Sequence, residues 1–480
     1  MSNAKAQNSN DKKKHEPIKG VKGTQDIFPK EYYRRTEVFK AIQECFESYG
    51  YQGMDVPIIE PLELHLRKSG DKIVKSMYTF KDYGNRDICL RPEITASVVR
   101  AFNEGLSNES RPVKIYYFGP TFRYDKPQEG RFRQFTQAGV EIIGSNSLEH
   151  DAEVIKLACD CMEKIGIKNY EIAISDVEIL FTIFKKLTIP EREKSLLIGA
   201  LEDLNKLKDI KSGIPDVKKK LIELGISKDE TESEEGKYFR ILEAIVELST
   251  IRGTPDYVFP KIESLLRKYI DDLTVLKPLE NLKIVSSCLD SFGINWQKAR
   301  IDFGFGRGLE YYTGTIFEIY CPRLGAANQV CGGGRYDELL SLLGGRGDSQ
   351  SIGFAFGFER LLLAIEREEE NKEDSAYQGN LKTSHLDALV IPLDKKLFRY
   401  AIKISQTLRV RGAKLDIDFS LRKSGKITKK ADQLKIPFVI YIGEEEEKQG
   451  FLSIKDLKSG IQEKYPLNDI EKIIEKISDR

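Results

Sequence analysis

The sequence predicts an α+β protein in which a large antiparallel sheet flanked by helices is followed by a smaller α/β domain. Its 480 residues are too many for a single ordinary core, so at least two domains are expected. Residues 114–125 and 131–144 read as strands, and the turn "KPQEG" between them predicts a β-hairpin. After residue 385, strand-like segments alternate with helical ones, which is typical of a mostly parallel sheet.

The N-terminal elements follow from local signals. Residues 1–16 are polar and free of repeats, which indicates a disordered tail. A helix with apolar residues at helical spacing is expected to end at Gly50, and a later helix is expected to begin at Ser147 as its N-cap. Residues 51–60 read as a strand with Pro57 inside it. Because proline cannot donate to a ladder, this strand lies at an edge or bends.

Composition marks the domain boundaries. From about 187 to 250 the chain is highly charged and poor in glycine and aromatic residues, which predicts a helical insertion within a domain of residues 17–366. Residues 367–384 are charged and polar and read as a solvated linker. Residues 385–480 form the expected α/β domain.

Bulk charge and cysteine content indicate which partners and which cellular compartment are compatible with this sequence. Lys and Arg number 76 against 75 Asp and Glu, so composition neither requires nor excludes a nucleic-acid partner. Seven scattered cysteines without a CxxC pair indicate a reducing compartment and no structural zinc. No apolar run approaches the roughly 20 residues of a membrane helix, and no secretory signal opens the chain, so a cytosolic protein is expected.

Alternation along the second strand of the hairpin predicts a polar face. That face carries Arg131, Arg133, Phe135, Gln137, Gly139 and Glu141. Arg123, on the opposing strand, adds a third arginine, and guanidinium groups bind phosphate oxygens in a bidentate manner. A phenylalanine ring among them suits the face of a nucleobase. A site for an anionic nucleotide is one interpretation of this face, and a solvated sheet surface is the other.

Three more segments hold candidate ligand-binding residues. Glu93 and Thr95, at a strand–helix junction, either cap the helix or bind a ligand. The three glycines of 332–334, just before Tyr336, permit close backbone approach but lack a P-loop pattern. Arg360 is a cation in an apolar segment, so it pairs either with an internal acid or with a ligand phosphate.

Taken together, these segments resemble the histidyl-tRNA synthetase family, which belongs to the class II aminoacyl-tRNA synthetases. Residues 22–29 are similar to its N-terminal signature, and the strand around Pro57 is similar to motif 1, which builds class II dimers. Residues 122–144 resemble motif 2, and residues 353–366 resemble motif 3. Two segments are more selective for the histidine enzymes: "RGLEYYTGTIFE" and "GGRYDELL". Residues 385–480 resemble the anticodon-binding domain shared with the glycyl, prolyl and threonyl enzymes.

The resemblance implies an enzyme that activates L-histidine with ATP and transfers it to the 3′ end of tRNA(His). The residues expected to hold ATP are Arg123, Arg131, Phe135 and Arg360. Those expected around the histidine are Glu93, Thr95, Gln137, Glu141, Arg307, Tyr311, Tyr312 and Tyr336. The residues expected to act in catalysis are Arg307, Arg123 and Gln137. Gln128, in the hairpin turn, is expected to contact the tRNA acceptor end.

The resemblance also implies the cofactor and the partners. Mg²⁺ would accompany ATP as part of the substrate, with no metal ligands from protein side chains. The partners would be tRNA(His) and a second copy of the chain, forming a cytoplasmic homodimer that binds neither membranes nor DNA. Alternation over residues 307–317 places Tyr311 on the side of Arg307 and Tyr312 on the other. Both tyrosines therefore reach the site only if that strand bends.

Several positions depart from the pattern of bacterial members. Tyr124, Asp125 and Lys126 replace a His-Glu-Arg sequence, Thr136 replaces a histidine, and Ile94 replaces a glycine. Glu310 stands where an aspartate is usual.

Three other functions are possible for this sequence. A non-catalytic regulatory subunit of ATP phosphoribosyltransferase would share motif 2, but it typically lacks the C-terminal domain and the histidine signature. A class II enzyme for glycine or proline and a stress-sensing domain that binds uncharged tRNA are the other two. Arg307 with its tyrosines, together with the domain of 385–480, favours the histidine enzyme.

Overall fold

The computed structural model describes residues 17–67, 74–186, 244–269, 276–304, 312–345, 350–370 and 384–478. The chain divides into two compact units, Met1–Ala376 and Tyr377–Arg480. Several predictions lie outside the described residues: the tail of 1–16, the insertion over 187–243, the linker over 371–383, and the two site residues Arg307 and Tyr311. Among the described residues, no helix has both the length and the apolar character needed to span a bilayer.

The first unit is built on a nine-stranded sheet with the order β1-β5-β6-β12-β11-β10-β7-β9-β8. In that order the strands are β1 (Gln52–Gly53), β5 (Val113–Phe122), β6 (Gln134–Ile143), β12 (Ser351–Gly357), β11 (Gln329–Arg335), β10 (Thr315–Tyr320), β7 (Glu171–Asp176), β9 (Ala299–Asp302) and β8 (Arg252–Gly253). Neighbours from β5 to β7 are all antiparallel, whereas β1 with β5 and β7 with β9 are parallel. The predicted α+β architecture, with a hairpin of β5 and β6, is confirmed.

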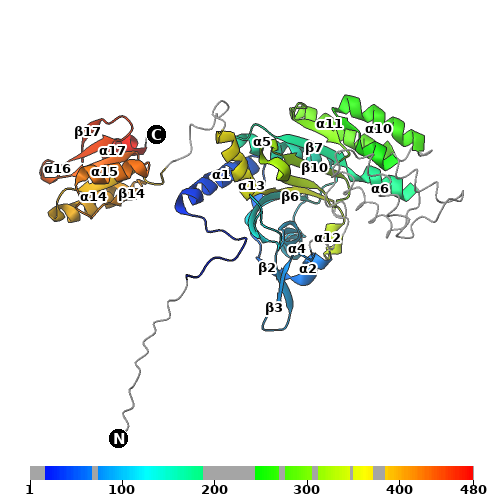
Figure 1. Cartoon of the computed structure of the whole chain (residues 1–480), viewed down its shortest axis with the longest axis horizontal. Coiled ribbons are helices and arrows are strands. Elements are labelled where there is room, and N and C mark those ends of the chain that lie inside the picture. Colours follow the sequence, from blue (N-terminus) through cyan, green and yellow to red (C-terminus); the bar gives the residue numbers. More distant parts are fainter. Residues whose placement is uncertain are drawn as a thin grey trace, which may run out of the picture. The chain divides into compact units, whose positions relative to one another are not determined.

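A second, three-stranded sheet has the order β2-β4-β3, and Figure 1 shows the loop between β3 and β4 projecting from the unit. Its strands are β2 (Ile59–Pro61), β4 (Asp87–Leu90) and β3 (Tyr78–Lys81). The single strand predicted over 51–60 is therefore two short strands in different sheets. Pro57 lies in the segment between them, and Arg91 donates to the carbonyls of Val56 and Pro57 there.

Helices cover both faces of the large sheet (Figure 1). In chain order they are α1 (Pro29–Ser48), α2 (Leu62–Leu66), α4 (Thr95–Gly105), α5 (Leu148–Lys164), α6 (Val177–Lys186), α10 (Pro255–Tyr269), α11 (Lys277–Ser291), the 3₁₀ helix η3 (Pro322–Ala327), α12 (Leu339–Leu342) and α13 (Phe358–Glu370). Helix α13 extends four residues into the segment predicted as a linker. Ser147 is the N-cap of α5 as predicted, but its hydroxyl donates to the Glu149 carboxylate instead of capping the helix.

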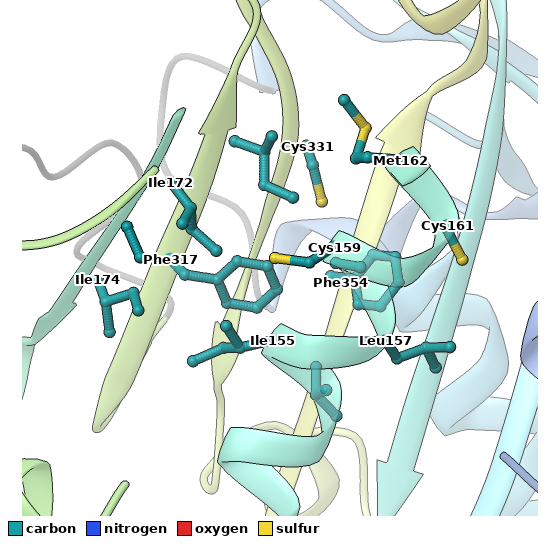
Figure 2. Packing of buried hydrophobic residues seen from close by; sticks show 14 of the residues in the cluster. Ile155, Leu157, Cys159, Cys161, Met162, Ile172, Ile174, Phe317, Cys331 and Phe354 are labelled. Atoms are coloured by element: carbon teal, nitrogen blue, oxygen red, sulfur yellow. The ribbon is translucent and has the colours of Figure 1, made fainter. Parts of the chain in front are cut away.

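The main core lies between one face of the sheet and helices α1, α5, α11 and α13. Figure 2 shows α5 crossing the sheet, with Ile155 and Cys159 directed toward Phe317 and Phe354. On β6, Ala138 also belongs to this core, so the residues between the core positions point to the opposite face. That opposite face is the one on which the polar residues gather.

The second unit is a five-stranded sheet with the order β14-β13-β15-β16-β17 and helices on both faces. Its strands are β14 (Leu415–Ile417), β13 (Ala388–Pro392), β15 (Phe438–Ile442), β16 (Phe451–Asp456) and β17 (Gln462–Pro466). Its helices are η4 (Lys395–Leu397), α14 (Phe398–Val410), α15 (Ser424–Gln433), α16 (Glu444–Gln449) and α17 (Ile470–Ser478). The first three strands are parallel, as predicted, and β16 and β17 add an antiparallel edge.

Candidate active site

The candidate site lies on the sheet face that points away from the main core. Alternation along β6 places Phe135, Gln137, Gly139 and Glu141 on this face, as the sequence predicts. Strand β6 begins only at Gln134, however, so Arg131 and Arg133 precede the strand and the prediction that they share its face is wrong. Arg131 instead donates to Asp125 at 2.6 Å within the hairpin.

Glu141 is the most deeply placed acid of the face, with 1% of its surface exposed. Its carboxylate accepts hydrogen bonds from the hydroxyls of Tyr117, at 3.1 Å, and Tyr336. The neighbouring strand contributes Gly353, where an added Cβ would lie 1.8 Å from the Glu141 carboxylate. Only glycine leaves room for this carboxylate to lie flat on the sheet.

Tyr312 stands on the same face, beyond Glu141. A Cβ added at Gly334 would lie 2.9 Å from the Tyr312 ring, so the ring rests on that strand. Burial raises the pKa of the Tyr312 phenol, and the charges of Glu318 and Glu141 raise it further. Tyr312 therefore stays protonated and is a hydrogen-bond donor at neutral pH.

A second buried acid, Glu93, closes the site at the start of α4. Its carboxylate accepts from the backbone N–H of Ala96 at 3.1 Å, so the helix-capping interpretation is confirmed. The Gln137 amide oxygen accepts from the N–H of Ile94 at 3.1 Å, which ties β6 to the same helix start. Thr95 lies beside them, with its hydroxyl 3.4 Å from that of Tyr117.

Two of the predicted cations are held by main-chain carbonyls. The Arg123 guanidinium lies 5.5 Å from the centre of the Phe135 ring and donates to the Pro92 carbonyl at 2.8 Å. Burial lowers the pKa of Arg123, although an arginine stays charged at neutral pH. Arg360, at the start of α13, donates to the Gln329 carbonyl at 2.6 Å. The Arg123 guanidinium beside the Phe135 ring can hold a planar, anionic ligand.

Arg91 and Arg335 are buried arginines that bind groups within the protein. Arg91 is buried and donates to main-chain carbonyls, among them that of Pro120 at 2.9 Å. Arg335 forms a buried ion pair with Asp151 and donates to the Ser145 carbonyl at 2.8 Å. These two arginines anchor the backbone next to Glu93 and Tyr336.

The hairpin turn presents residues that depart from the family pattern. Gln128 is exposed and exchanges main-chain hydrogen bonds with Arg131. Tyr124 is 58% exposed, and the Arg133 guanidinium lies 3.8 Å from its ring centre. Thr136, on β6, is half-buried, and the Glu359 carboxylate of α13 accepts from its N–H at 2.8 Å.

Sequence reasoning missed two residues of this face, Tyr117 and Glu318. Tyr117 lies directly opposite Gly139 across the hairpin. The position of the "KPQEG" turn sets that register, so the signal was present in the sequence. Glu318 lies beyond the histidine signature tyrosines on β10, between the core residues Phe317 and Ile319. Its placement depends on how β10 and β11 pair, which no local pattern gives.

Two family models match the chain. One described as histidyl-tRNA synthetase covers residues 23–361, and one described as anticodon binding domain covers residues 387–477. The histidine–tRNA ligase of Thermococcus kodakarensis is 36% identical over 447 residues, which cover 92% of this chain and 94% of that protein. The corresponding ligase of Pyrococcus furiosus is 33% identical over 460 residues, covering 94% and 98%.

Two solved structures of histidyl-tRNA synthetases are similar to this chain. The histidyl-tRNA synthetase of S. aureus superimposes with a TM-score of 0.67 and 28% identity, covering 95% of this chain and all of that one. The histidyl-tRNA synthetase of Nostoc sp. PCC 7120 shares the fold with a TM-score of 0.76 at 24% identity, covering 96% and 100%. The chain belongs to the histidyl-tRNA synthetase family.

Proposed function

We propose that this member of the histidyl-tRNA synthetase family is a histidine–tRNA ligase. It forms histidyl-adenylate from L-histidine and ATP, and it then transfers the histidine to the 3′ end of tRNA(His). Family membership supports the reaction class, and the side chains of the site support the choice of amino acid.

The observation that carries the specificity is the buried Glu141 with its phenol partners. An imidazole offers one N–H donor and one nitrogen acceptor. Glu141 would accept from the N–H, and the protonated Tyr312 hydroxyl would donate to the other nitrogen. Tyr117 and Tyr336 hold the carboxylate in place from two sides. An apolar side chain would leave these groups unpaired, and sites of this kind discriminate by ~10⁴ or more without editing.

The other end of the amino acid would face the start of α4. Glu93 accepts from the Ala96 N–H through both carboxylate oxygens and lies 3.6 Å from His65 Nδ1, and its negative charge suits an ammonium group. Thr95 and Gln137 lie beside it. The histidine carboxylate would then point toward the Arg123 side of the site.

Activation joins two anions, and the arginines of the site offset their repulsion. An oxygen of the histidine carboxylate attacks the α-phosphorus, a new P–O bond forms, and the bond to the leaving pyrophosphate breaks. Arg123 and Arg360 would hold the phosphates, with Phe135 against the adenine. Positioned charges of this kind stabilise the equatorial oxygens of the transition state. From the sequence resemblance, Arg307 would contact the α-phosphate and Gln137 would assist.

Magnesium would arrive with ATP. Mg²⁺ usually binds substrate phosphates together with few protein ligands, so the proposal assigns it to the phosphate oxygens of ATP. The remaining partners follow from the family: tRNA(His), read in part by the C-terminal unit, and a second copy of the chain. We place the protein in the cytoplasm, where ATP and tRNA are found.

Amino-acid-dependent exchange between ATP and pyrophosphate tests this proposal. Exchange with histidine alone, followed by charging of tRNA(His), is the expected result. Exchange with glycine or proline would show that the enzyme activates that amino acid instead of histidine. A folded protein that exchanges with no amino acid would overturn the proposal in favour of a regulatory subunit.

A further inference from the structure

Two successive arginines of α1 connect this helix to α13, and they reach different parts of it. Arg34 donates to Glu369 at 2.8 Å and to Glu366 at 3.4 Å, both in the later turns of α13. Arg35 donates to Glu359 at 2.8 Å, in the first turn of the same helix. The proposed function assigns no task to either arginine.

The Glu359 carboxylate continues the sheet at the point where β12 ends. Strand β12 pairs with β6 as far as Gly357, opposite Gln137, and the chain then enters α13 at Phe358. The ladder stops there, and the N–H of the next residue of β6, Thr136, donates to the Glu359 carboxylate at 2.8 Å. One side chain therefore joins the first turn of α13 to the start of β6.

Arg35 holds this carboxylate from the core side of the sheet. Its Nη2 donates to Glu359 at 2.8 Å and to the Thr136 hydroxyl at 3.0 Å. The guanidinium also lies 5.1 Å from the centre of the Phe358 ring. The side chains of Arg35 and Glu359 are 14% and 6% exposed, so solvent ions screen their attraction little. A planar guanidinium that binds two groups and stacks on a third is held in one place.

The two backbone segments that meet at Glu359 each carry a residue proposed to bind ATP. On β6, alternation places Thr136 on the core side and the preceding Phe135 on the site face. On α13, the residue after Glu359 is Arg360. A Cβ added at Gly130 would lie 3.5 Å from Arg360 Cγ, so the hairpin turn before β6 lies against this side chain. A shift of α13 along β6 would therefore change where Arg360 lies relative to Phe135.

We propose that Arg35 is a positioning residue for the ATP site. It fixes the Glu359 carboxylate and thereby keeps the first turn of α13 in register with the start of β6. Because Arg35 lies on the core side of the sheet, it contacts neither substrate and acts only through Glu359 and Thr136. The inference rests on the proposed function, which makes Phe135 and Arg360 groups that bind ATP.

Pyrophosphate exchange at varied ATP and varied histidine tests this role with Arg35→Met, which removes the guanidinium and keeps an unbranched side chain. A displacement of about 1 Å in a binding group can cost about 100-fold, so kcat/KM for ATP should fall by about 10- to 100-fold. The KM for histidine should stay within about twofold of wild type, because Glu141 lies farther along β6.

Arg35→Lys restores the charge but not the planar fork. An ammonium group cannot bind Glu359 and Thr136 while stacking on Phe358, so the loss in kcat/KM for ATP should be smaller, about 3- to 10-fold. If Arg35→Met does not fold, the lysine variant decides: wild-type kcat/KM for ATP in Arg35→Lys would overturn the role.

Arg34→Met is the matched control, because it removes the neighbouring contact between α1 and α13. It should leave kcat/KM for ATP within about twofold of wild type. Urea unfolding of both methionine variants measures their loss of stability, which a purely structural role would produce without weakening the use of ATP. The positioning role is overturned if folded Arg35→Met uses ATP as Arg34→Met does, or if its KM for histidine rises as much as its KM for ATP.

Calorimetric titration with ATP alone separates this inference from the proposed function. A wild-type protein that exchanges with no amino acid would refute the proposed function. In that case, weaker ATP binding by Arg35→Met than by Arg34→Met would still support the positioning role. Equal affinities of the two variants, or no binding of ATP by wild type, would overturn it.

Discussion

Replacing Tyr117 with phenylalanine would remove one hydroxyl from the site without changing the shape of the side chain. Tyr117 is buried, and its hydroxyl donates to Glu141 at 3.1 Å. A hydrogen bond to a charged group contributes about 1.5–3 kcal/mol, and 1.4 kcal/mol corresponds to a factor of ten. Since Glu141 is proposed to bind the imidazole, the KM for histidine should rise by about 10- to 150-fold. The KM for ATP should change by less than about threefold.

The adjacent Tyr116 provides a matched control. It lies on the same strand with its ring toward the opposite face, and its hydroxyl donates to the exposed Glu47 at 2.9 Å. Tyr116→Phe deletes the same kind of hydrogen bond outside the site, so both KM values should stay within about twofold of wild type.

Pyrophosphate exchange at varied histidine and varied ATP measures both variants. The placement of the imidazole at Glu141 would be refuted by either of two results. One is an equal rise in both KM values for Tyr117→Phe, and the other is a Tyr117→Phe variant that behaves as Tyr116→Phe does. Urea unfolding of each variant separates a loss of binding from a loss of folded protein.

Three further predictions concern stability, pH and catalysis. Asp151→Asn removes the fully buried carboxylate that pairs with Arg335 and leaves it only Asp337, at 3.3 Å, so the free energy of unfolding in urea titrations should fall by about 3 kcal/mol. The exposed pair tested by Glu471→Gln should cost less than about 1 kcal/mol, and similar losses would contradict the burial argument. Burial lowers the pKa of His150, so its contribution to stability is complete above about pH 6.5 and is lost as the pH falls. His150→Gln should therefore flatten the decline in the free energy of unfolding between about pH 7 and pH 5. An unchanged slope would count against this contribution of His150. Arg307→Ala should reduce adenylate formation far more than tRNA binding, because its charge is proposed to act on the reacting phosphate, and equal losses in the two assays would argue against that role.

Local pattern was sufficient to predict the part of the fold that carries the site. The alternation of residues 135–142 and the "KPQEG" turn together gave the hairpin, its polar face and the inward direction of Glu141. The same pattern failed for Arg131 and Arg133, because the ladder ends at Gln134 and the chain beyond it turns. Alternation is a property of paired strand, so it stops where pairing stops.

Contacts between distant segments could not be predicted in this way. Arg335 and Asp151 are 184 positions apart, and Thr136 and Glu359 are 223 apart. The sequence marked Arg360 as a cation that pairs either with an internal acid or with a ligand phosphate, and the structure shows it donating to the Gln329 carbonyl. The buried Arg91 and Arg335 bind main chain and acids within the protein. Which arginine faces a ligand is decided by the pairing of strands, which a single sequence does not encode locally.

Glu93 shows why a structural and a functional interpretation of one residue need not compete. The sequence left open whether it caps a helix or binds a ligand, and the structure places its carboxylate on the N–H of Ala96. An ionised carboxylate offers about four lone-pair positions, so one carboxylate can accept from a helix N–H and also from a second donor. The cap also fixes the direction of the carboxylate, and an acid held in this way binds an ammonium group without first losing rotamer freedom. Helix capping by Glu93 is therefore what makes it suitable for the amino end of the substrate.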